Sequence, residues 1–143
     1  MTSPVPEGLA FVRQLIDSHE PPSPMAQMFN TEVVAADEGR VTLVSRPGEN
    51  ANSRRGAIHG GVVCTLLDTA AVLAALTCCD PIRSYSTVDL TTHFMRSATA
   101  GEQDFTTYAE VLKPGARISF VQGRVEDAEG RVLATATASV FVG

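Results

Sequence analysis

The feature that most limits how this chain can fold is a long apolar segment, Gly60–Cys79, in which Asp68 is the only charged residue. The segment is rich in Ala, Leu and Val and is too long for one strand, so it predicts a helix. A helix that is apolar on nearly all sides is normally buried. A membrane span is the alternative, because Val62–Cys79 approaches the ~20 residues that cross a bilayer. Asp68 near its middle would cost roughly 2.5–3.5 kcal/mol there, and we expect the rest of the chain, not a membrane, to cover the helix.

The rest of the chain is dominated by segments of strand character, rich in Val, Thr and Phe. A hairpin with a Gly-containing turn precedes the apolar helix, and four longer strands follow it. The expected strands are Thr31–Ala36, Arg40–Ser45, Tyr85–Phe94, Gln103–Leu112, Arg117–Glu126 and Arg131–Val142. Strict alternation in the third strand puts Val88, Leu90 and Phe94 on one face and Thr87 on the other. In the last strand both alternating sets contain apolar residues, which indicates cover on both faces for part of its length.

The N-terminal region predicts a short amphipathic helix, Glu7–Ser18, followed by a proline-rich run that ends at Pro24. We therefore expect a single α+β domain over residues 1–143, with residues 1–24 forming the N-terminal helix and linker. One long central helix would be wrapped by an antiparallel sheet of about six strands, the last four following one another as a meander. One helix cannot cover such a sheet, so a second subunit is expected to cover the remaining edges or faces.

Composition and charge exclude several classes of function. The net charge is −5 and the pI is about 5.1, whereas a nucleic-acid surface needs clustered Lys and Arg. The eleven basic residues are scattered, so no polybasic membrane patch is expected. Cys64, Cys78 and Cys79 lack zinc-site spacing and are expected to be free thiols in a reducing cytosol. Because the start, Met1–Pro4, lacks the basic and apolar parts of a signal peptide, we expect a cytoplasmic protein.

The run Gly56–Gly61, of sequence GAIHGG, leads directly into the apolar helix and points to chemistry. Two glycines at a helix start let a ligand approach the backbone without meeting a side chain. The first N–H groups of a helix have no internal partner, and the helix dipole adds partial positive charge. Such an end suits a carbonyl oxygen that becomes an oxyanion. His59 either moves protons or shapes the turn by bonding to the backbone, and we favour the second interpretation.

Asp68 lies seven residues after Gly61, almost two full turns, so both are expected on one side of the helix and in one groove. A carboxylate among apolar side chains is costly unless it has hydrogen bonds or a functional reason to be there. Two interpretations stay open: a structural acid satisfied by Thr65 or Thr69, and a catalytic carboxylate. The glycine pair on the same helix face favours catalysis.

The spacing of His59-Gly60-Gly61 and Asp68 resembles the phenylacetate-type branch of the hotdog thioesterases, in the superfamily of 4-hydroxybenzoyl-CoA thioesterase. The resemblance extends over roughly residues 28–142 and includes three later segments. These are Ser86–Leu90, Phe94–Ala98 and Val111–Gly115. It implies a hotdog fold and a homodimer, often a dimer of dimers, with active sites at the subunit interface.

The resemblance also implies the roles of the site residues in hydrolysing an acyl-CoA thioester. Asp68 would be general base or nucleophile, and the Gly60 amide would polarise the thioester carbonyl. Thr87 of the partner subunit, or Ser86 if the register slips, would position water or the carboxylate. The family usually has Asn six residues before the histidine, where this chain has Ser53, and Asn52 lies one residue earlier.

The substrate would run from an apolar acyl pocket to solvent. The residues expected to contact it are Gly61, Ser53, Leu67, Val72 and Arg117. Arg117 and the pair Arg54-Arg55 are candidates for the CoA phosphates, because guanidinium groups suit phosphate oxygens. Thioester hydrolysis needs no cofactor or metal. Two alternatives are a non-catalytic acyl-CoA-binding module, which would not require Asp68, and a hydratase or dehydratase, which usually requires a His paired with an acid.

Overall fold

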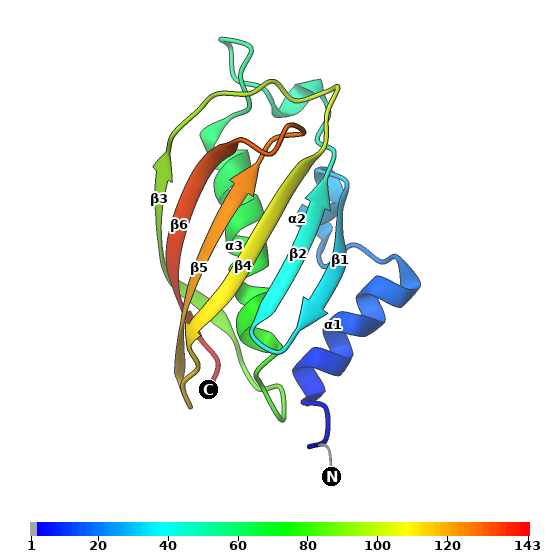
Figure 1. Cartoon of the computed structure of the whole chain (residues 1–143), viewed down its shortest axis with the longest axis vertical. Helices are drawn as coiled ribbons and strands as arrows, with labels where there is room; N and C mark the ends of the chain where they lie inside the picture. The colour runs from blue at the N-terminus through cyan, green and yellow to red at the C-terminus, as the bar shows by residue number, and fades with distance from the viewer. Residues whose placement is uncertain (1–2) are drawn as a thin grey trace.

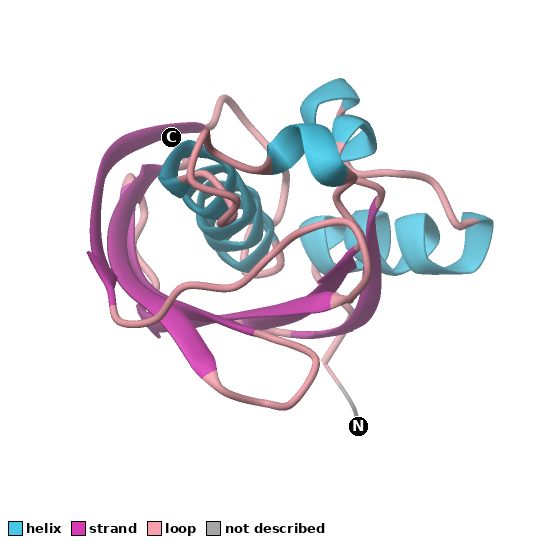
Figure 2. Ribbon diagram, turned by 90° about the horizontal axis from the view of Figure 1, so that it is seen from above, coloured by secondary structure: helices cyan, strands magenta, loops and turns pink. Residues whose placement is uncertain are grey.

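The computed structural model describes residues 3–143, in which a curved antiparallel sheet of six strands wraps around one long helix (Figures 1 and 2). The helices are α1 Glu7–Ser18, α2 Pro24–Met28 and α3 Gly60–Leu76, with a 3-10 turn, η1, at Glu49–Ala51. The strands are β1 Thr31–Asp37, β2 Arg40–Ser45, β3 Ser86–Phe94, β4 Phe105–Lys113, β5 Ile118–Glu126 and β6 Val132–Phe141. The predicted α+β fold with a central helix is confirmed. Met1 and Thr2, part of the start on which the cytoplasmic prediction rests, lie outside the described residues.

Helix α3 is the centre of the fold, and the sheet curves around it (Figure 2). Its buried side chains form two parts of the core. Leu66 and Leu67 pack in one part with Phe105 of β4, and Leu73 packs in the other with Leu43 of β2. Burying each such side chain stabilises the fold by about 1.5–3 kcal/mol. No helix within residues 3–143 combines the length and apolarity that a membrane crossing requires.

The predicted four-strand meander is wrong for β3. The sheet order is β1-β2-β4-β5-β6-β3, so β3 lies at an edge beside β6, and β4 pairs with β2. Residues 95–104 connect β3 to β4 across one end of the sheet (Figure 1). The Ile58 N–H donates to the Ala98 carbonyl over 2.7 Å, which ties this connection to the segment before α3. Alternation identifies strands but not their neighbours, because a loop of this length spans up to ~33 Å.

Strand β3 also departs from the strict alternation predicted for it. Its pairing with β6 shifts between Thr87 and Asp89, so Val88 is an extra residue, a β-bulge. The bulge turns Thr87 toward α3, on the same side as Leu90, while Val88 is exposed. A period of two residues cannot reveal such an insertion, and the predicted face of Thr87 is therefore wrong.

The predicted N-terminal helix forms as α1 and lies along β1 (Figure 1). Gly8 permits its close approach to α3, since a Cβ there would stand 1.6 Å from the Leu76 carbonyl oxygen. Arg13 Nε donates to the Ala36 carbonyl over 3.4 Å, so α1 covers the outer edge of β1. The linker is followed by a short helix that the sequence-based prediction lacks, α2, which begins at Pro24 and is capped by the Ser23 hydroxyl.

Candidate active site

The face of α3 that the sheet leaves uncovered carries the only carboxylate of the helix. Gly61, Thr65, Asp68 and Val72 recur along it every three or four residues, which is one face of an α-helix. Thr87 Oγ1 of β3 donates a hydrogen bond to Asp68 Oδ1 over 2.5 Å. This bond fixes the half-buried carboxylate against β3 and leaves Oδ2 without a protein partner within residues 3–143.

The two threonines that would satisfy Asp68 if it were only a structural acid make their hydrogen bonds elsewhere. Thr65 Oγ1 donates to the Gly61 carbonyl over 2.9 Å, and Thr69 Oγ1 donates to the Thr65 carbonyl over 2.8 Å. Each hydroxyl thus satisfies the backbone one turn earlier in its own helix. Asp68 is held by Thr87 of the same chain instead. The resemblance implied a hydroxyl from the partner subunit, but the bulge in β3 turns this one inward.

His59 is the N-cap of α3. Its Nδ1 accepts a hydrogen bond from the Gly61 N–H over 2.8 Å, and its own N–H donates to the Ala51 carbonyl over 2.8 Å. Glycine at position 61 suits this cap, since a Cβ there would lie 3.0 Å from Nδ1. Because Nδ1 is an acceptor, the proton of the neutral ring is on Nε2. His59 therefore shapes the helix start, as we expected from the sequence.

Gly60 presents a backbone amide at the start of α3. Within residues 3–143 its N–H makes no hydrogen bond, as is usual for the first N–H groups of a helix. In front of it is a hollow of about 470 Å³, lined by the end of β3 and the segment that follows, including Phe94 and Arg96. The Phe94 ring touches this glycine, because a Cβ on Gly60 would lie 3.3 Å from Phe94 Cζ. The helix dipole makes this amide a favourable donor to a developing oxyanion.

Gly60 and Asp68 of one chain line different hollows, so they do not share the single groove predicted. Asp68 lines a hollow of about 210 Å³ with Phe11 of α1, Val72 and Tyr85. The two residues are eight positions apart, which is about 12 Å along the helix axis. The N–H groups at a helix start point away from the helix body, so the Gly60 amide is directed away from Asp68.

Asn52 and Ser53 hold the loop before α3 rather than point at a hollow. Asn52 Nδ2 donates to the Ala100 carbonyl over 2.9 Å, and its Oδ1 accepts from the Ala100 N–H over 2.8 Å. The Ser53 N–H donates to the Ala57 carbonyl over 2.7 Å, which closes the turn before the glycine motif. Both side-chain groups of Asn52 are thus occupied by the connection between β3 and β4.

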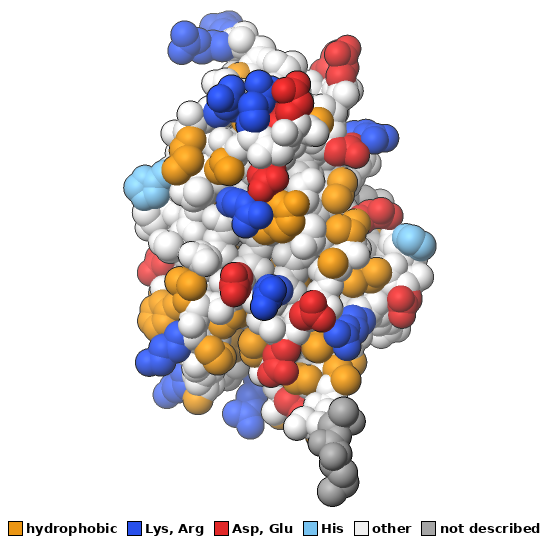
Figure 3. Space-filling view, viewed as in Figure 1, with side chains coloured by type: hydrophobic (Ala, Val, Ile, Leu, Met, Phe, Trp, Pro, Cys, Tyr) orange, Lys and Arg blue, Asp and Glu red, His pale blue; other side chains and the backbone are white. Residues whose placement is uncertain are grey.

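The other expected substrate contacts are dispersed. Leu67 belongs to the core, where it packs against Gly123 of β5. Val72 does line the hollow beside Asp68. Arg117 precedes β5 and its carbonyl accepts a hydrogen bond from the Val142 N–H after β6, so β6 separates it from the start of β3, the end of that strand away from Gly60. Arg54 and Arg55 are exposed in the loop before α3. On the face seen in Figure 3, basic and acidic side chains are interspersed rather than gathered by sign.

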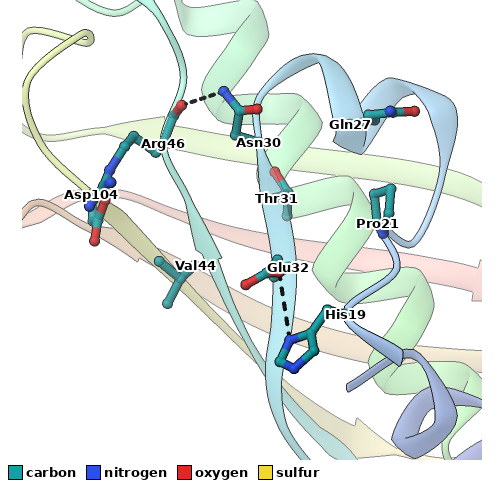
Figure 4. Close-up of a pocket in the computed structure, with 9 residues that line it drawn as sticks. All are labelled: His19, Pro21, Gln27, Asn30, Thr31, Glu32, Val44, Arg46 and Asp104. Atoms are coloured by element: carbon teal, nitrogen blue, oxygen red, sulfur yellow. Dashed lines mark hydrogen bonds and ion pairs between the residues drawn. The ribbon is translucent and has the colours of Figure 1, made fainter. Parts of the chain in front are cut away.

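Another hollow lies against β1 and β2 and is not lined by Asp68, although its wall at Pro21 is next in sequence to Pro22 of the Asp68 hollow. It has a volume of about 530 Å³ and contains the ion pair of Arg46 Nε with Asp104 Oδ1, 2.6 Å apart (Figure 4). His19 Nδ1 lies 3.8 Å from Glu32 Oε1 there, and both side chains are exposed. This exposed pair is the only histidine–carboxylate contact within residues 3–143, so it gives little support to the hydratase alternative.

The cysteines and acidic residues are the other groups that could react or bind a metal. Cys64, Cys78 and Cys79 are free, and burial raises the pKa of the Cys78 and Cys79 thiols, which makes the reactive thiolate scarcer. In the part of the chain that the structure describes, no three His, Cys, Asp or Glu side chains are grouped as metal ligands.

Two aromatic residues that line the hollow beside Asp68 were not among the site residues predicted from the sequence. They are Phe11 and Tyr85. The sequence did contain a sign of the role of Phe11, because this apolar residue lies outside the stripe of Leu9, Val12 and Leu15 that α1 buries. No sequence feature indicated the role of Tyr85, since an aromatic residue at a strand is common.

Comparison with known proteins places this geometry in context. The family model described as the thioesterase superfamily matches residues 55–134, more than half of the chain. A protein of Saccharolobus solfataricus named as an esterase is 28% identical over 116 residues, covering 81% of each chain. Human acyl-coenzyme A thioesterase 13 is 32% identical over 88 residues, covering 62% of this chain and 61% of the human one. The structure of the E. coli PaaI protein, from the phenylacetic acid degradation operon, superposes with a TM-score of 0.82 at 17% identity, covering 94% of this chain and 95% of that one. The last likeness supports the hotdog fold.

Proposed function

This chain belongs to the thioesterase superfamily, and on that premise we propose that it hydrolyses an acyl-CoA or related pantetheine thioester to a free acid and a thiol. The observation that carries the proposal is the Thr87–Asp68 hydrogen bond on the open face of α3, beside an apolar hollow. The human relative is named for acyl-coenzyme A, which supports this substrate class. The reaction consumes only the thioester and water, so it requires no metal or redox cofactor.

Asp68 is the proposed general base. The Thr87 hydroxyl occupies Oδ1, so Oδ2 is available to take a proton from a water molecule as that water attacks the thioester carbon. The same position would allow Asp68 to attack directly as a nucleophile. The carbonyl oxygen becomes negative and is stabilised by the Gly60 N–H. Collapse of the tetrahedral intermediate breaks the C–S bond, and the proton that Asp68 took from water passes to the leaving thiolate, which regenerates the carboxylate.

The two groups that act on one carbonyl come, in this proposal, from different subunits. An attacking atom must approach within about 3–3.5 Å of the carbon, and an oxyanion donor must lie within about 3.1 Å of the oxygen. Asp68 and Gly60 of one chain are poorly placed for this, because they line separate hollows and the amide points away. Asp68 with Thr87 from one chain and Gly60 from the other would complete a site.

The open edge of β3 is the surface on which two copies would meet. The β1 edge is covered by α1 through Arg13, whereas no strand within residues 3–143 pairs with the outer edge of β3. Exposed apolar side chains lie along this edge, at Tyr85, Val88, Phe94 and Met95. An uncovered edge of this length is a template for pairing with another chain.

Symmetry decides which residues such a pairing would bring together. Antiparallel pairing of two β3 strands about a twofold axis near Leu90, the middle residue of β3, sets the Thr87 end of one strand beside the Phe94 end of the other. Thr87 holds Asp68, and Phe94 touches Gly60. The homodimer therefore places the Asp68 hollow of one copy next to the Gly60 hollow of the second, twice.

The remaining candidates take supporting roles in this proposal. Asn52 and Ser53 hold the loop that presents the Gly60 amide. Arg54 and Arg55 lie in the same loop, where their guanidinium groups are candidates for the CoA phosphates. Arg117 is a weaker candidate for the same role, because it lies at the end of β6 that pairs with the start of β3, whereas Gly60 is at the opposite end of β3.

Asp68→Asn tests the proposal, because it keeps the size and the Thr87 contact but removes the base. We expect acyl-CoA hydrolysis, followed as release of free thiol, to fall at least ~100-fold, with folding and assembly unchanged by circular dichroism and light scattering. Asp17→Asn is the matched control, since Asp17 is an exposed carboxylate on α1. Near-normal turnover by an assembled Asp68→Asn protein would refute the assignment.

A further inference from the structure

The hollow beside Asp68 is built from parts of the chain that are distant in sequence. Phe11 comes from α1, Pro22 from the linker and Tyr85 from the residue before β3, while Val72 and Leu76 belong to α3. The N-terminal segment, which the sequence presents only as a helix and a proline-rich linker, therefore forms a wall next to the proposed catalytic carboxylate.

The shape of this hollow follows from α3. From Asp68 the lining residues continue through Val72 to Leu76, about 12 Å along the axis. At the Leu76 end α1 closes on α3, where a Cβ on Gly8 would stand 1.6 Å from the Leu76 carbonyl oxygen and the Gly8 N–H donates to the Cys79 carbonyl over 2.9 Å. The hollow thus begins at the carboxylate and ends at a helix contact that leaves no side-chain space.

Size and lining together limit what this hollow can hold. Its volume is about 210 Å³, whereas an apolar protein cavity of about 150 Å³ is known to accept benzene. Its aromatic and aliphatic side chains suit an apolar group. A group of about six to eight carbons matches this volume, and a long fatty chain would extend out of the hollow with part of its length unburied.

Resting on the proposed thioesterase function, we infer that this hollow is the acyl-binding subsite and that Phe11 and Val72 restrict the enzyme to compact apolar acyl groups. Phe11 forms the wall supplied by α1, and Val72 lies one helical turn beyond Asp68 on the same face. Specificity for acyl size is therefore set by the packing of the N-terminal helix on α3.

The test compares kcat/KM for acetyl-, hexanoyl-, phenylacetyl- and palmitoyl-CoA. A hydrophobic pocket discriminates by roughly 10–200-fold for each methylene that does not fit. We expect hexanoyl- and phenylacetyl-CoA to exceed palmitoyl-CoA by at least ~10-fold. A preference of the unmodified enzyme for palmitoyl-CoA would overturn the inference.

Two substitutions change the subsite in opposite directions. Phe11→Ala removes a wall and should raise the palmitoyl-to-hexanoyl ratio of kcat/KM at least ~10-fold, and Val72→Phe fills the hollow and should lower the hexanoyl-to-acetyl ratio of kcat/KM at least ~10-fold. Phe120→Ala is the matched control, since Phe120 is 47% exposed on β5 and Phe11 is 38% exposed. All three side chains are exposed or half-buried, so the variants are expected to fold, which circular dichroism would check.

The outcomes separate this inference from the proposed function. If hydrolysis depends on Asp68 but neither Phe11→Ala nor Val72→Phe changes the acyl profile relative to Phe120→Ala, the acyl group binds elsewhere and the inference is wrong, while the function stands. If the enzyme hydrolyses none of the four thioesters, the proposed function fails and the subsite with it.

Discussion

At the scale of single residues, the hydrogen-bond partner of each polar group separates its structural role from its chemical one. The Gly61 N–H donates its hydrogen bond to His59, and the side-chain amide of Asn52 makes both of its hydrogen bonds with the backbone of Ala100. The Gly60 amide and one oxygen of Asp68 remain without protein partners within residues 3–143. The proposed chemistry uses these two groups because nothing in the fold already occupies them.

Thr87 is a positioning residue in this account, and its hydroxyl can be tested apart from its bulk. Thr87→Val keeps the branched shape and removes the donor to Asp68. A hydrogen bond to a charged group contributes about 1.5–3 kcal/mol, so we expect kcat to fall roughly 10- to 100-fold, with KM little changed. Thr87→Ser should restore most of the rate. If serine and valine reduce kcat equally, packing rather than the hydrogen bond explains the effect.

Gly60 is tested by adding a side chain, because the proposed donor is a backbone amide. Gly60→Val places a branched group against Phe94, where even a Cβ would stand 3.3 Å from the ring, and into the space that the carbonyl must enter. Loss of one oxyanion donor costs about 2.7–4 kcal/mol, or ~100- to 1000-fold in kcat. Gly60→Ala is the smaller perturbation, and an effect mainly on KM would indicate a steric block.

The exposed loop residue Gly48 offers a control, since Gly48→Ala alters a glycine that has a negative φ and is outside both hollows. We expect its kcat to match that of the unmodified enzyme. Wild-type rates in folded, assembled Gly60→Val and Gly60→Ala would show that this helix start is only a turn.

At the scale of elements, the sequence predicted what depends on local pattern. The apolar helix, the hairpin and the six strands follow from periodicity, and neighbours Leu133 and Ala134 in β6 are both buried, as the double apolar pattern indicated. The place of β3 in the sheet and the bulge at Val88 depend on contacts between distant segments. The helix α2 was detectable, because Ser23 followed by a proline is a known helix start.

For the candidate site too, the features within one local motif were predictable from the sequence, and the contacts between distant segments were not. Asp68 and the glycine pair are in one local motif, so spacing alone put Asp68 and Gly61 on one helix face. The partner of Asp68 could not be predicted from alternation, because the bulge in β3 reverses the face of Thr87. Phe11 lines the hollow beside Asp68 and Phe94 lines the hollow beside Gly60, and neither residue belongs to the local motif that contains the glycines and Asp68.

The turn between β5 and β6 gives a prediction about pH. Burial alone raises the pKa of the Asp127 carboxyl, but hydrogen bonds from the Arg131 and Glu129 N–H groups and from the Arg131 guanidinium outweigh it, so the pKa lies below its usual value. A lowered folded-state pKa gives stability that is present above the unfolded-state pKa, about 3.9, and is lost as the pH falls through the folded value.

We therefore expect Asp127→Asn to unfold at a lower temperature than the unmodified protein at pH 7. This difference should shrink as the pH falls below about 4. Asp37→Asn is the matched control, because Asp37 pairs with Arg13 at 3.3 Å in an exposed position where such pairs contribute little. A difference for Asp127→Asn that is constant between pH 7 and pH 3 would contradict the linkage.

At the scale of the whole molecule, the fold has two sheet edges that differ in their cover. The N-terminal helix protects β1 and, in the same position, contributes Phe11 to the hollow beside Asp68. The β3 edge is open and carries both contacts that define the proposed site, Thr87 with Asp68 and Phe94 with Gly60. In our proposal, one edge therefore provides substrate selection and the other provides assembly of the catalytic groups.

The central claim, that each site combines Asp68 of one subunit with Gly60 of the other, is tested most directly by mixing two inactive variants. Asp68→Asn and Gly60→Val are dissociated together and allowed to re-associate, and thioester hydrolysis is measured. Random pairing makes half of the dimers mixed, and each mixed dimer has one intact site of two, so activity should recover to about a quarter of the unmodified level. If both groups act within one chain, every site keeps one defect, and the mixture will stay as inactive as its components.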